Sequence, residues 1–366
     1  MKLIVKQDKF AKALSSVNRI ATYRKDLPIV SNIFIKAQGN RLILTATNIE
    51  LSIKIEIPAK IETEGEVLVP PKLLNSFVTS LPKCDLTIEF KNGRLKVYSD
   101  KYRSIFNSVP ADDYPAIPEI EEKEAVKYVI PALEFKKDVS QVISAASSDT
   151  ARPALTGVYL NTYEGYIYLA ATDGYRLADK RVLKVDKEIE ALIPATTLQE
   201  VVREIDESTG DIEIVFSTKQ VLFRVNNSDI TSQLIDAKYP KYKEIIPKES
   251  DTVIKINKDE FISAVKIAAI FASGSNGGIN ISAEKESSSL IVSSIASEYG
   301  ENTSEISADV SNDGQVTLNS TYLLNALNAI DGKKIIFRFS GKLSPCVLYA
   351  DEKDVDYIHV VMPLKN

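Results

Sequence analysis

The sequence contains a helix-like segment about every 63 residues, and this repeat limits the folds that the chain can adopt. Six segments carry apolar residues at the spacing of one face of an α-helix, with anchors at Phe10, Leu73, Phe135, Leu198, Phe261 and Leu324. Successive anchors lie 63, 62, 63, 63 and 63 residues apart. Such regular spacing predicts one supersecondary unit that is repeated along the chain.

The segments between the helices alternate apolar and polar residues, as antiparallel strands do. Asn92-Gly93, a pair typical of tight hairpins, separates Leu86–Phe90 from Arg94–Tyr98. Comparable pairs are Ile212–Phe216 with Val221–Val225, and Ile335–Phe339 with Cys346–Tyr349. Each unit is therefore predicted to contain one helix and several antiparallel strands, and the predicted fold class is α+β.

Two such units form a longer period of about 125 residues. Asp113-Tyr114-Pro115 recurs 125 residues later as Lys238-Tyr239-Pro240. A chain of 366 residues also exceeds the size of one ordinary core. We predict three domains of two half-units each, spanning residues 1–124, 125–250 and 251–366.

Composition and residue types argue against several classes of protein. Hydrophobic residues make up 44% of the chain and charged residues 26%, as in soluble globular proteins. The start, MKLIVKQDKF, lacks the apolar core of a signal peptide, so we expect a cytoplasmic protein without a membrane partner. Cys84, Cys346 and the lone His359 stand apart, which predicts no metal or other cofactor and a structural role for His359.

The stretch Ala170–Ala178 places a carboxylate, a phenol and a guanidinium around Gly174. One hypothesis is an enzyme with a repeated fold that uses Asp173, Tyr175 and Arg176. The stretch has no histidine or second carboxylate beside it, whereas Asp-Gly is a common tight-turn pair, so the residues alone favour a structural turn.

A linear array of these units ends in two open sheet edges, which promote aggregation unless a partner covers them. Pairing the leading edge of one chain with the trailing edge of a second chain would close both edges. A two-fold axis then generates a ring of six domains from a head-to-tail homodimer.

Over its full length the chain resembles the bacterial DNA polymerase III beta subunits, the sliding clamps. Four motifs carry the resemblance: ATDGYRLA at Ala171–Ala178, RPALTG at Arg152–Gly157, YPKYKEIIP at Tyr239–Pro247 and VVMPLKN at Val360–Asn366. The resemblance implies a homodimeric, non-catalytic ring that encircles double-stranded DNA without sequence preference. It also implies a cytoplasmic, nucleoid-associated protein.

The partners implied by the resemblance are the replicative DNA polymerase alpha subunit, a clamp loader that opens the ring, and other proteins with a clamp-binding motif. Repair polymerases, mismatch-repair proteins and ligase belong to this last group. A monomeric peptide-binding adaptor that does not bind DNA stays open as an alternative.

The family's peptide-binding cleft falls on mostly apolar residues, which suit an apolar peptide anchor, with Arg176 offering donors at the rim. The corresponding residues are Leu155, Thr172, Gly174, Tyr175, Arg176, Leu177, Pro240, Tyr242, Ile245, Val347, Val360, Val361, Met362, Pro363 and Leu364. Many members have an arginine and an apolar residue where this chain has Lys365 and Asn366, and often a basic residue at Glu244. Partner preference therefore stays open.

Basic residues gather at the start of the chain, although its formal charge is −5. Residues 1–60 carry 11 basic and 4 acidic side chains, a net charge of +7. A ring retains DNA by topology, so weak phosphate contacts are sufficient. The candidate DNA-binding residues are Lys9, Lys12, Arg19, Arg24, Lys25, Lys72, Lys83 and Arg152.

The resemblance also places the dimer junction, as an apolar centre with charged residues around it. In the first domain it implies Lys72, Ser104 and Phe106. In the third domain it implies Ile270, Phe271, Glu298, Glu301 and Glu305.

Overall fold

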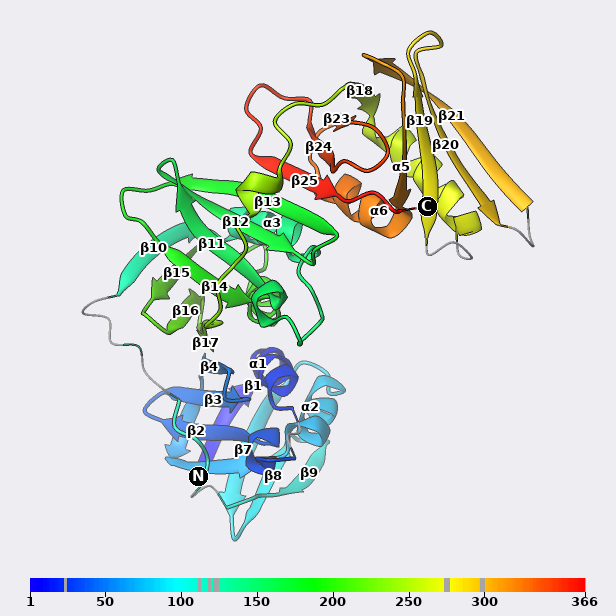
Figure 1. Cartoon of the computed structure of the whole chain (residues 1–366). Helices are drawn as coiled ribbons and strands as arrows, with labels where there is room; N and C mark the ends of the chain where they lie inside the picture. The colour runs from blue at the N-terminus through cyan, green and yellow to red at the C-terminus, as the bar shows by residue number, and fades with distance from the viewer. Residues whose placement is uncertain are drawn as a thin grey trace. The chain divides into compact units, whose positions relative to one another are not determined.

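The computed structural model of the chain describes residues 1–22, 25–110, 113–117, 120, 125–272, 277–296 and 300–365. These residues form two compact units (Figure 1). Unit 1 comprises Met1–Glu134 with Gln199–Leu234, and unit 2 comprises Phe135–Leu198 with Ile235–Asn366. This division cuts the predicted middle domain in two, and the two boundaries between the three predicted domains stay a prediction.

Unit 1 contains a five-stranded sheet, in the order β5-β1-β7-β8-β9, and an eight-stranded sheet, in the order β10-β15-β16-β17-β4-β3-β2-β6. The first strands are β1 Lys2–Lys6, β2 Ile33–Gln38, β3 Arg41–Thr47, β4 Leu51–Pro58, β5 Lys60–Thr63, β6 Gly65–Val69, β7 Asp85–Lys91, β8 Arg94–Tyr98 and β9 Arg103–Asn107. The others are β10 Val126–Pro131, β15 Asp211–Phe216, β16 Gln220–Val225 and β17 Ser228–Gln233.

Unit 2 contains one sheet of twelve strands, in the order β14-β11-β12-β13-β25-β24-β23-β18-β21-β20-β19-β22. Its strands are β11 Gly157–Tyr163, β12 Tyr166–Thr172, β13 Arg176–Lys184, β14 Glu190–Pro194, β18 Thr252–Asn257, β19 Gly278–Glu284, β20 Ser289–Ala296, β21 Gly300–Val310, β22 Gly314–Asn319, β23 Lys334–Phe339, β24 Cys346–Ala350 and β25 Tyr357–Val361. All of the strand pairs with an assigned register are antiparallel, as predicted.

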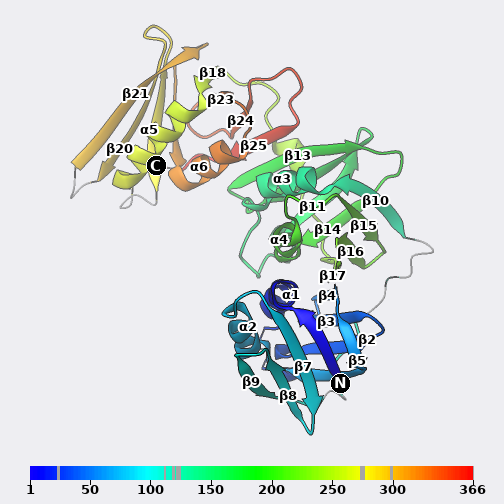
Figure 2. The ribbon, with the colours of Figure 1, turned by 180° about the vertical axis from the view of Figure 1, so that it is seen from behind.

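Within the described residues, six α-helices occupy the six predicted positions. They are α1 Gln7–Ile20, α2 Pro71–Thr79, α3 Ala132–Ile143, α4 Ala195–Glu204, α5 Lys258–Phe271 and α6 Ser320–Ala329. In the figures α1 lies beside α2, and α5 beside α6 (Figure 2), and the two helices of each pair are in contact. None of the described helices is both long and apolar enough to span a membrane.

Two of the six predicted anchors, Leu73 and Leu324, are not fully buried: Leu324 is half-buried, and its neighbour Leu323 is fully buried. Phe10, Phe135, Leu198 and Phe261 are buried, whereas Leu73 is 74% exposed and its neighbour Leu74 is fully buried. Adjacent residues on a helix point about 100° apart, so only one leucine of the pair can face the sheets. The regular spacing therefore predicted the helix correctly but chose the wrong leucine.

The predicted hairpins are confirmed. Strands β7 and β8 pair with Lys91 opposite Arg94, and Asn92 and Gly93 between them both have positive φ, at 51° and 71°. Two successive positive φ angles are the mark of the turn that matches the twist of a tight hairpin. The other two predicted pairs are β15 with β16 and β23 with β24.

Two turns that lie 125 residues apart have the same hydrogen bonds. In the turn between β3 and β4, Asn48 Oδ1 accepts from the amides two and three residues later, at 3.2 and 2.8 Å. In the turn between β12 and β13, Asp173 Oδ1 does the same at 2.8 and 3.0 Å. The next residue has a positive φ in both turns, 81° at Ile49 and 92° at Gly174. A β-branched residue in this region is strained.

We expect Ile49→Gly to stabilise unit 1 by about 1 kcal/mol. Relief of backbone strain of about 1–3 kcal/mol outweighs the roughly 0.5–1 kcal/mol entropic cost of glycine. Little packing is lost, because Ile49 is 44% exposed. The measurement is the midpoint of urea unfolding. Ile49→Ala is the control, since it removes the same side chain but keeps the Cβ atom; equal midpoints for the two variants would contradict the strain argument.

Candidate functional site

The turn between β12 and β13 is held by its own side chains. Thr172 Oγ1 accepts from the amide of Gly174 at 3.1 Å and donates to the carbonyl of Arg176 at 2.6 Å. A Cβ atom on Gly174 would lie 3.3 Å from Arg152 Nη1. Tyr175, at the tip, is 59% exposed. The result is a fixed turn that presents one aromatic side chain to solvent.

The C-terminal strand lies directly beside this turn. Strand β13 pairs with β25 so that Leu177 is opposite Val360, and Val347 of β24 is opposite Val360 on the other side. Beyond β25, the amide of Met362 donates to the carbonyl of Tyr175 at 2.8 Å. The structure therefore brings together two of the predicted site segments that lie almost 190 residues apart in the sequence.

A buried apolar cluster lies behind these strands, and it includes four of the predicted site residues. Its buried members are Ala170, Leu177, Leu192, Tyr239, Tyr242, Val347 and Val360. Thr172 and Val361 are buried as well. Leu155, Arg176, Met362, Pro363 and Leu364 are half-buried, and Gly174, Tyr175, Pro240 and Ile245 are exposed. The predicted site thus consists of a buried floor with partly exposed apolar residues above it.

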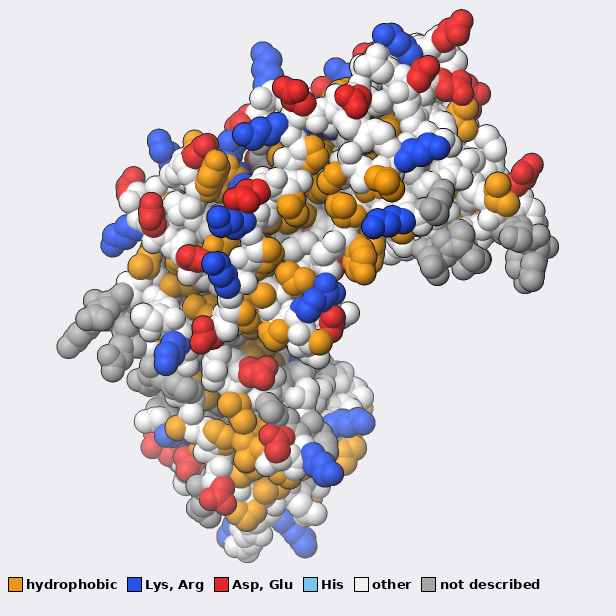
Figure 3. Space-filling view, viewed as in Figure 1, with side chains coloured by type: hydrophobic (Ala, Val, Ile, Leu, Met, Phe, Trp, Pro, Cys, Tyr) orange, Lys and Arg blue, Asp and Glu red, His pale blue; other side chains and the backbone are white. Residues whose placement is uncertain are grey.

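Hydrophobic side chains gather on the face of unit 2 that carries β12, β13 and β25 (Figure 3). Helix η4, Tyr242–Ile245, borders this face, and its Ile245 is 53% exposed. Tyr239, just before η4, stacks on Tyr159 with ring centres 4.6 Å apart. We call the partly exposed residues Tyr175, Pro240, Ile245, Met362 and Leu364 the apolar rim.

The Arg176 side chain makes its contacts within the protein. Its Nε donates to Asp173 Oδ2 at 3.1 Å and its Nη2 to the carbonyl of Ser144. The guanidinium also lies over the ring of Tyr322, 4.6 Å from the ring centre, and the side chain is only 10% exposed. The prediction that Arg176 offers donors at the rim stays untested, but the observed contacts give it a different role, which is to anchor the turn to α3 and α6.

Two of the three residues that the catalytic hypothesis requires, Asp173 and Arg176, are engaged in the fold. The Asp173 carboxylate bonds two turn amides and Arg176. His359 is fully buried, with Nδ1 2.7 Å from the hydroxyl of Tyr357, and burial together with the nearby Arg176 lowers its pKa to about 3. His359 is therefore a neutral core residue, as predicted. Over the described part of the chain, no three His, Cys, Asp or Glu side chains gather as a metal site would require.

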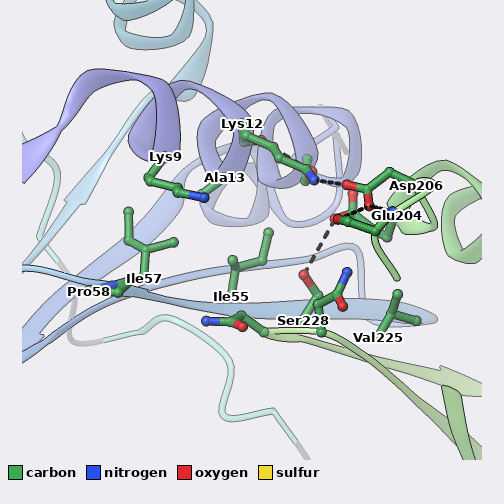
Figure 4. Close-up of a pocket in the computed structure, with 14 residues that line it drawn as sticks. Lys9, Lys12, Ala13, Ile55, Ile57, Pro58, Glu204, Asp206, Val225 and Ser228 are labelled. Carbon is green, nitrogen blue, oxygen red and sulfur yellow. Dashed lines mark hydrogen bonds and ion pairs between the residues drawn. The ribbon is translucent and has the colours of Figure 1, made fainter. Parts of the chain in front are cut away.

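The candidate DNA-binding residues differ in whether a carboxylate pairs with them. Lys12 Nζ lies 2.6 Å from Asp206 Oδ2. Arg19 pairs with two carboxylates: its Nε lies 2.7 Å from Glu200 Oε2 and its Nη2 lies 2.8 Å from Glu204 Oε1. Figure 4 shows the pocket of about 330 Å³ between α1 and β4 in which Lys12 meets Asp206. The sequence missed these pairs because their partners lie more than 180 residues away.

The remaining cations of this group that the structure describes are exposed. Arg152 is paired with the equally exposed Asp149 at 3.0 Å. Arg24 lies outside the described residues. Lys9, Lys25, Lys72 and Lys83 are exposed on unit 1, and Lys12 is exposed as well although it is paired with Asp206.

One open edge of unit 1 carries the residues predicted for the dimer junction. Strand β9 is the last strand of its sheet. Its Phe106 is half-buried and packs on Phe77 of α2, with ring centres 5.9 Å apart, and Ser104 is also half-buried. Lys72 is exposed at the start of α2. Leu73, 74% exposed, and Ile105, 50% exposed, add apolar surface that the sequence analysis did not assign to the junction.

Unit 2 has a matching open edge on β21. Strand β18 pairs with residues 308–310 of β21, so among the described strands residues 300–307 pair on one side only, with β20. Glu301 and Glu305 are exposed along this edge. Ile270 of α5, which contacts β21, is 71% exposed, and Phe271 is half-buried. Glu298 lies outside the described residues.

Models of known protein families match almost the whole length of the chain. Residues 1–118, 129–241 and 243–365 match the family models of the N-terminal, central and C-terminal domains of the DNA polymerase III beta subunit. The Beta sliding clamp of Bacillus subtilis (strain 168) is 29% identical over 381 residues, which cover 100% of both chains.

Solved structures agree with these matches. The DNA polymerase sliding clamp from Bacillus subtilis superposes with a TM-score of 0.93 at 28% identity, covering 100% of this chain and 99% of that one. The DNA polymerase III subunit beta from Pseudomonas aeruginosa has a TM-score of 0.92 at 23% identity, with 100% of both chains covered, and at that identity supports the fold.

Proposed function

This chain belongs to the DNA polymerase III beta subunit family, and from that membership we propose that it is a DNA sliding clamp, a ring that holds the replicative polymerase on its template. The observation that carries this function is the match of all three domain models, in order, to nearly the whole chain. A sliding clamp is a processivity factor and not an enzyme, in agreement with the engagement of Asp173 and Arg176 in the turn.

The ring is a head-to-tail homodimer. Its junction joins the β9 edge of one protomer to the β21 edge of the other. Lys72 at the first edge and Glu301 and Glu305 at the second carry opposite charges, and exposed apolar residues accompany each edge, Leu73 at the first and Ile270 at the second. Covering these edges removes the two open strands that would otherwise promote aggregation.

Duplex DNA passes through the ring and is held by linkage rather than by tight binding. Lys9, Lys25, Lys72 and Lys83 are exposed and supply weak contacts to phosphates, which carry no sequence information. Lys12 and Arg19 contribute less, because carboxylates of the same unit neutralise them. This accounts for a DNA-encircling protein whose formal charge is −5.

The apolar rim and its buried floor accept a short apolar peptide of a partner protein. The polymerase alpha subunit, the clamp loader and repair polymerases, mismatch-repair proteins and ligase are the partners proposed for this surface, and we place their encounter on the nucleoid in the cytoplasm. Tyr175 and Met362 suit such a role, because an exposed aromatic ring and a flexible thioether adapt to different apolar side chains.

The mass of the particle in solution separates the ring from the rival hypothesis of a monomeric adaptor. Sedimentation at micromolar concentration should give twice the 40.5 kDa of the chain. A stable monomer at that concentration would favour the adaptor.

A further inference from the structure

The ammonium group of Lys243, on η4, is enclosed by one carboxylate and three aromatic rings. Its Nζ lies 2.6 Å from Asp179 Oδ2 and 3.5 Å from the ring centre of Tyr168. The ring centres of Tyr163 and Tyr242 lie 5.2 and 5.3 Å away. Ion pairing and cation–π attraction therefore act together on one side chain, which is 30% exposed.

Asp179, on β13, binds η4 with both of its carboxylate oxygens. Oδ2 accepts from Lys243, and Oδ1 accepts from the hydroxyl of Tyr242 at 3.0 Å. Asn161 Nδ2 in turn donates to the oxygen of Tyr242 at 3.2 Å. Asp179 is only 4% exposed, and burial raises the pKa of its carboxyl group. The fold therefore buries this carboxylate at a cost in free energy, and both of its oxygens bind residues of the short helix η4.

This pair lies directly behind the proposed peptide site. Leu177 and Asp179 are two residues apart on β13 and therefore share a face of the sheet. Leu177 and Tyr242 belong to the same buried cluster. Residues 240–245, which bring Pro240 and Ile245 to the apolar rim, lie between Tyr239, packed on Tyr159, and Pro247, whose carbonyl accepts from Arg338 at 2.7 Å.

We propose that Asp179 and Lys243 form a latch that positions residues 240–245 to receive the apolar anchor of a partner peptide. Both are positioning residues, because they lie behind the apolar rim. They act through Tyr242 and η4 and not by touching the peptide. The inference rests on the proposed peptide-binding function. An ion pair suits this task because it fixes a direction as well as a distance, whereas apolar packing alone allows the short helix to slide.

The test titrates a fluorescein-labelled peptide from the replicative polymerase alpha subunit into the full-length dimer and follows fluorescence anisotropy. Lys243→Met keeps the length of the side chain but removes its charge, and we expect the dissociation constant to rise about tenfold. Lys243→Arg restores the charge and should bring the constant back to within about threefold of the original. The matched control is Lys238→Met, at an exposed lysine outside residues 240–245, which should leave the dissociation constant unchanged.

A second variant separates positioning from simple stabilisation. Asp179→Asn combined with Lys243→Met removes both charges, so no unpaired buried charge is left and the urea midpoint should return close to that of the original protein. We expect peptide affinity to stay about tenfold lower in this double variant. Recovery of affinity together with stability would overturn the latch, and so would unchanged affinity in Lys243→Met.

The failure of the latch differs from the failure of the proposed function. If the original protein binds the peptide and Tyr175→Ala weakens binding while the latch variants do not, only the latch is wrong. If the original protein does not bind the peptide at all, the proposed peptide site fails and the latch with it.

Discussion

Replacing Phe106 and Ile270 with aspartate should convert the ring into folded monomers. Each junction then buries two carboxylates without partners, and an uncompensated buried charge costs about 3–5 kcal/mol. A closed ring has two such junctions, so the dimer loses this free energy at each of them. The measurement is sedimentation velocity at micromolar concentration, with circular dichroism to show that the chain is folded.

The two positions differ in how cleanly they report on the junction. Ile270 is 71% exposed in the single chain, so Ile270→Asp alone leaves the fold intact. Phe106 packs on Phe77, so Phe106→Asp also removes a contact within unit 1. Leu343→Asp is the control, since Leu343 is 65% exposed and lies between β23 and β24, neither of which is a junction strand. Persistence of the dimer in the double variant would place the interface elsewhere.

Deleting Met362–Asn366 should weaken peptide binding by roughly 2–4 kcal/mol, about thirtyfold or more in affinity. The deletion removes Met362 and Leu364 from the apolar rim, together with the bond from the amide of Met362 to the carbonyl of Tyr175. Strand β25 ends at Val361, so its pairing with β13 and β24 survives. The dimer and its loading on DNA should therefore be unaffected.

Anisotropy titration of the polymerase-derived peptide measures this effect. The matched control deletes only Lys365 and Asn366, which keeps both apolar side chains and should lower affinity by less than about threefold. A truncated protein that is dimeric and binds the peptide as tightly as the full chain would show that the C-terminal segment is not part of the site.

Local features of the fold were predictable from the sequence. Helix periodicity and the Asn92-Gly93 turn depend on residues that are close in the chain, and the structure confirms them. Leu73 shows the limit of this reasoning. Two adjacent leucines fit the same pattern, and only the packing of α2 decides which one is buried.

The candidate site depends on contacts that a single sequence does not reveal. The pairing of Leu177 with Val360 and the ion pair of Arg19 with Glu200 join residues more than 180 positions apart. The resemblance to sliding clamps predicted the first of these, because the family places both segments at one cleft. It did not predict the inward direction of Arg176, which depends on Ser144 and Tyr322 in two different helical regions.

The central claim is that this protein is a ring linked to DNA by topology, and one measurement tests it most directly. The labelled protein is loaded by the clamp loader onto nicked circular DNA and passed through a sizing column before and after the circle is cut once. The account predicts that the protein elutes with the intact circle and is lost from the linear form, because a ring slides off free ends. Equal retention on circular and linear DNA would contradict encirclement and indicate ordinary binding.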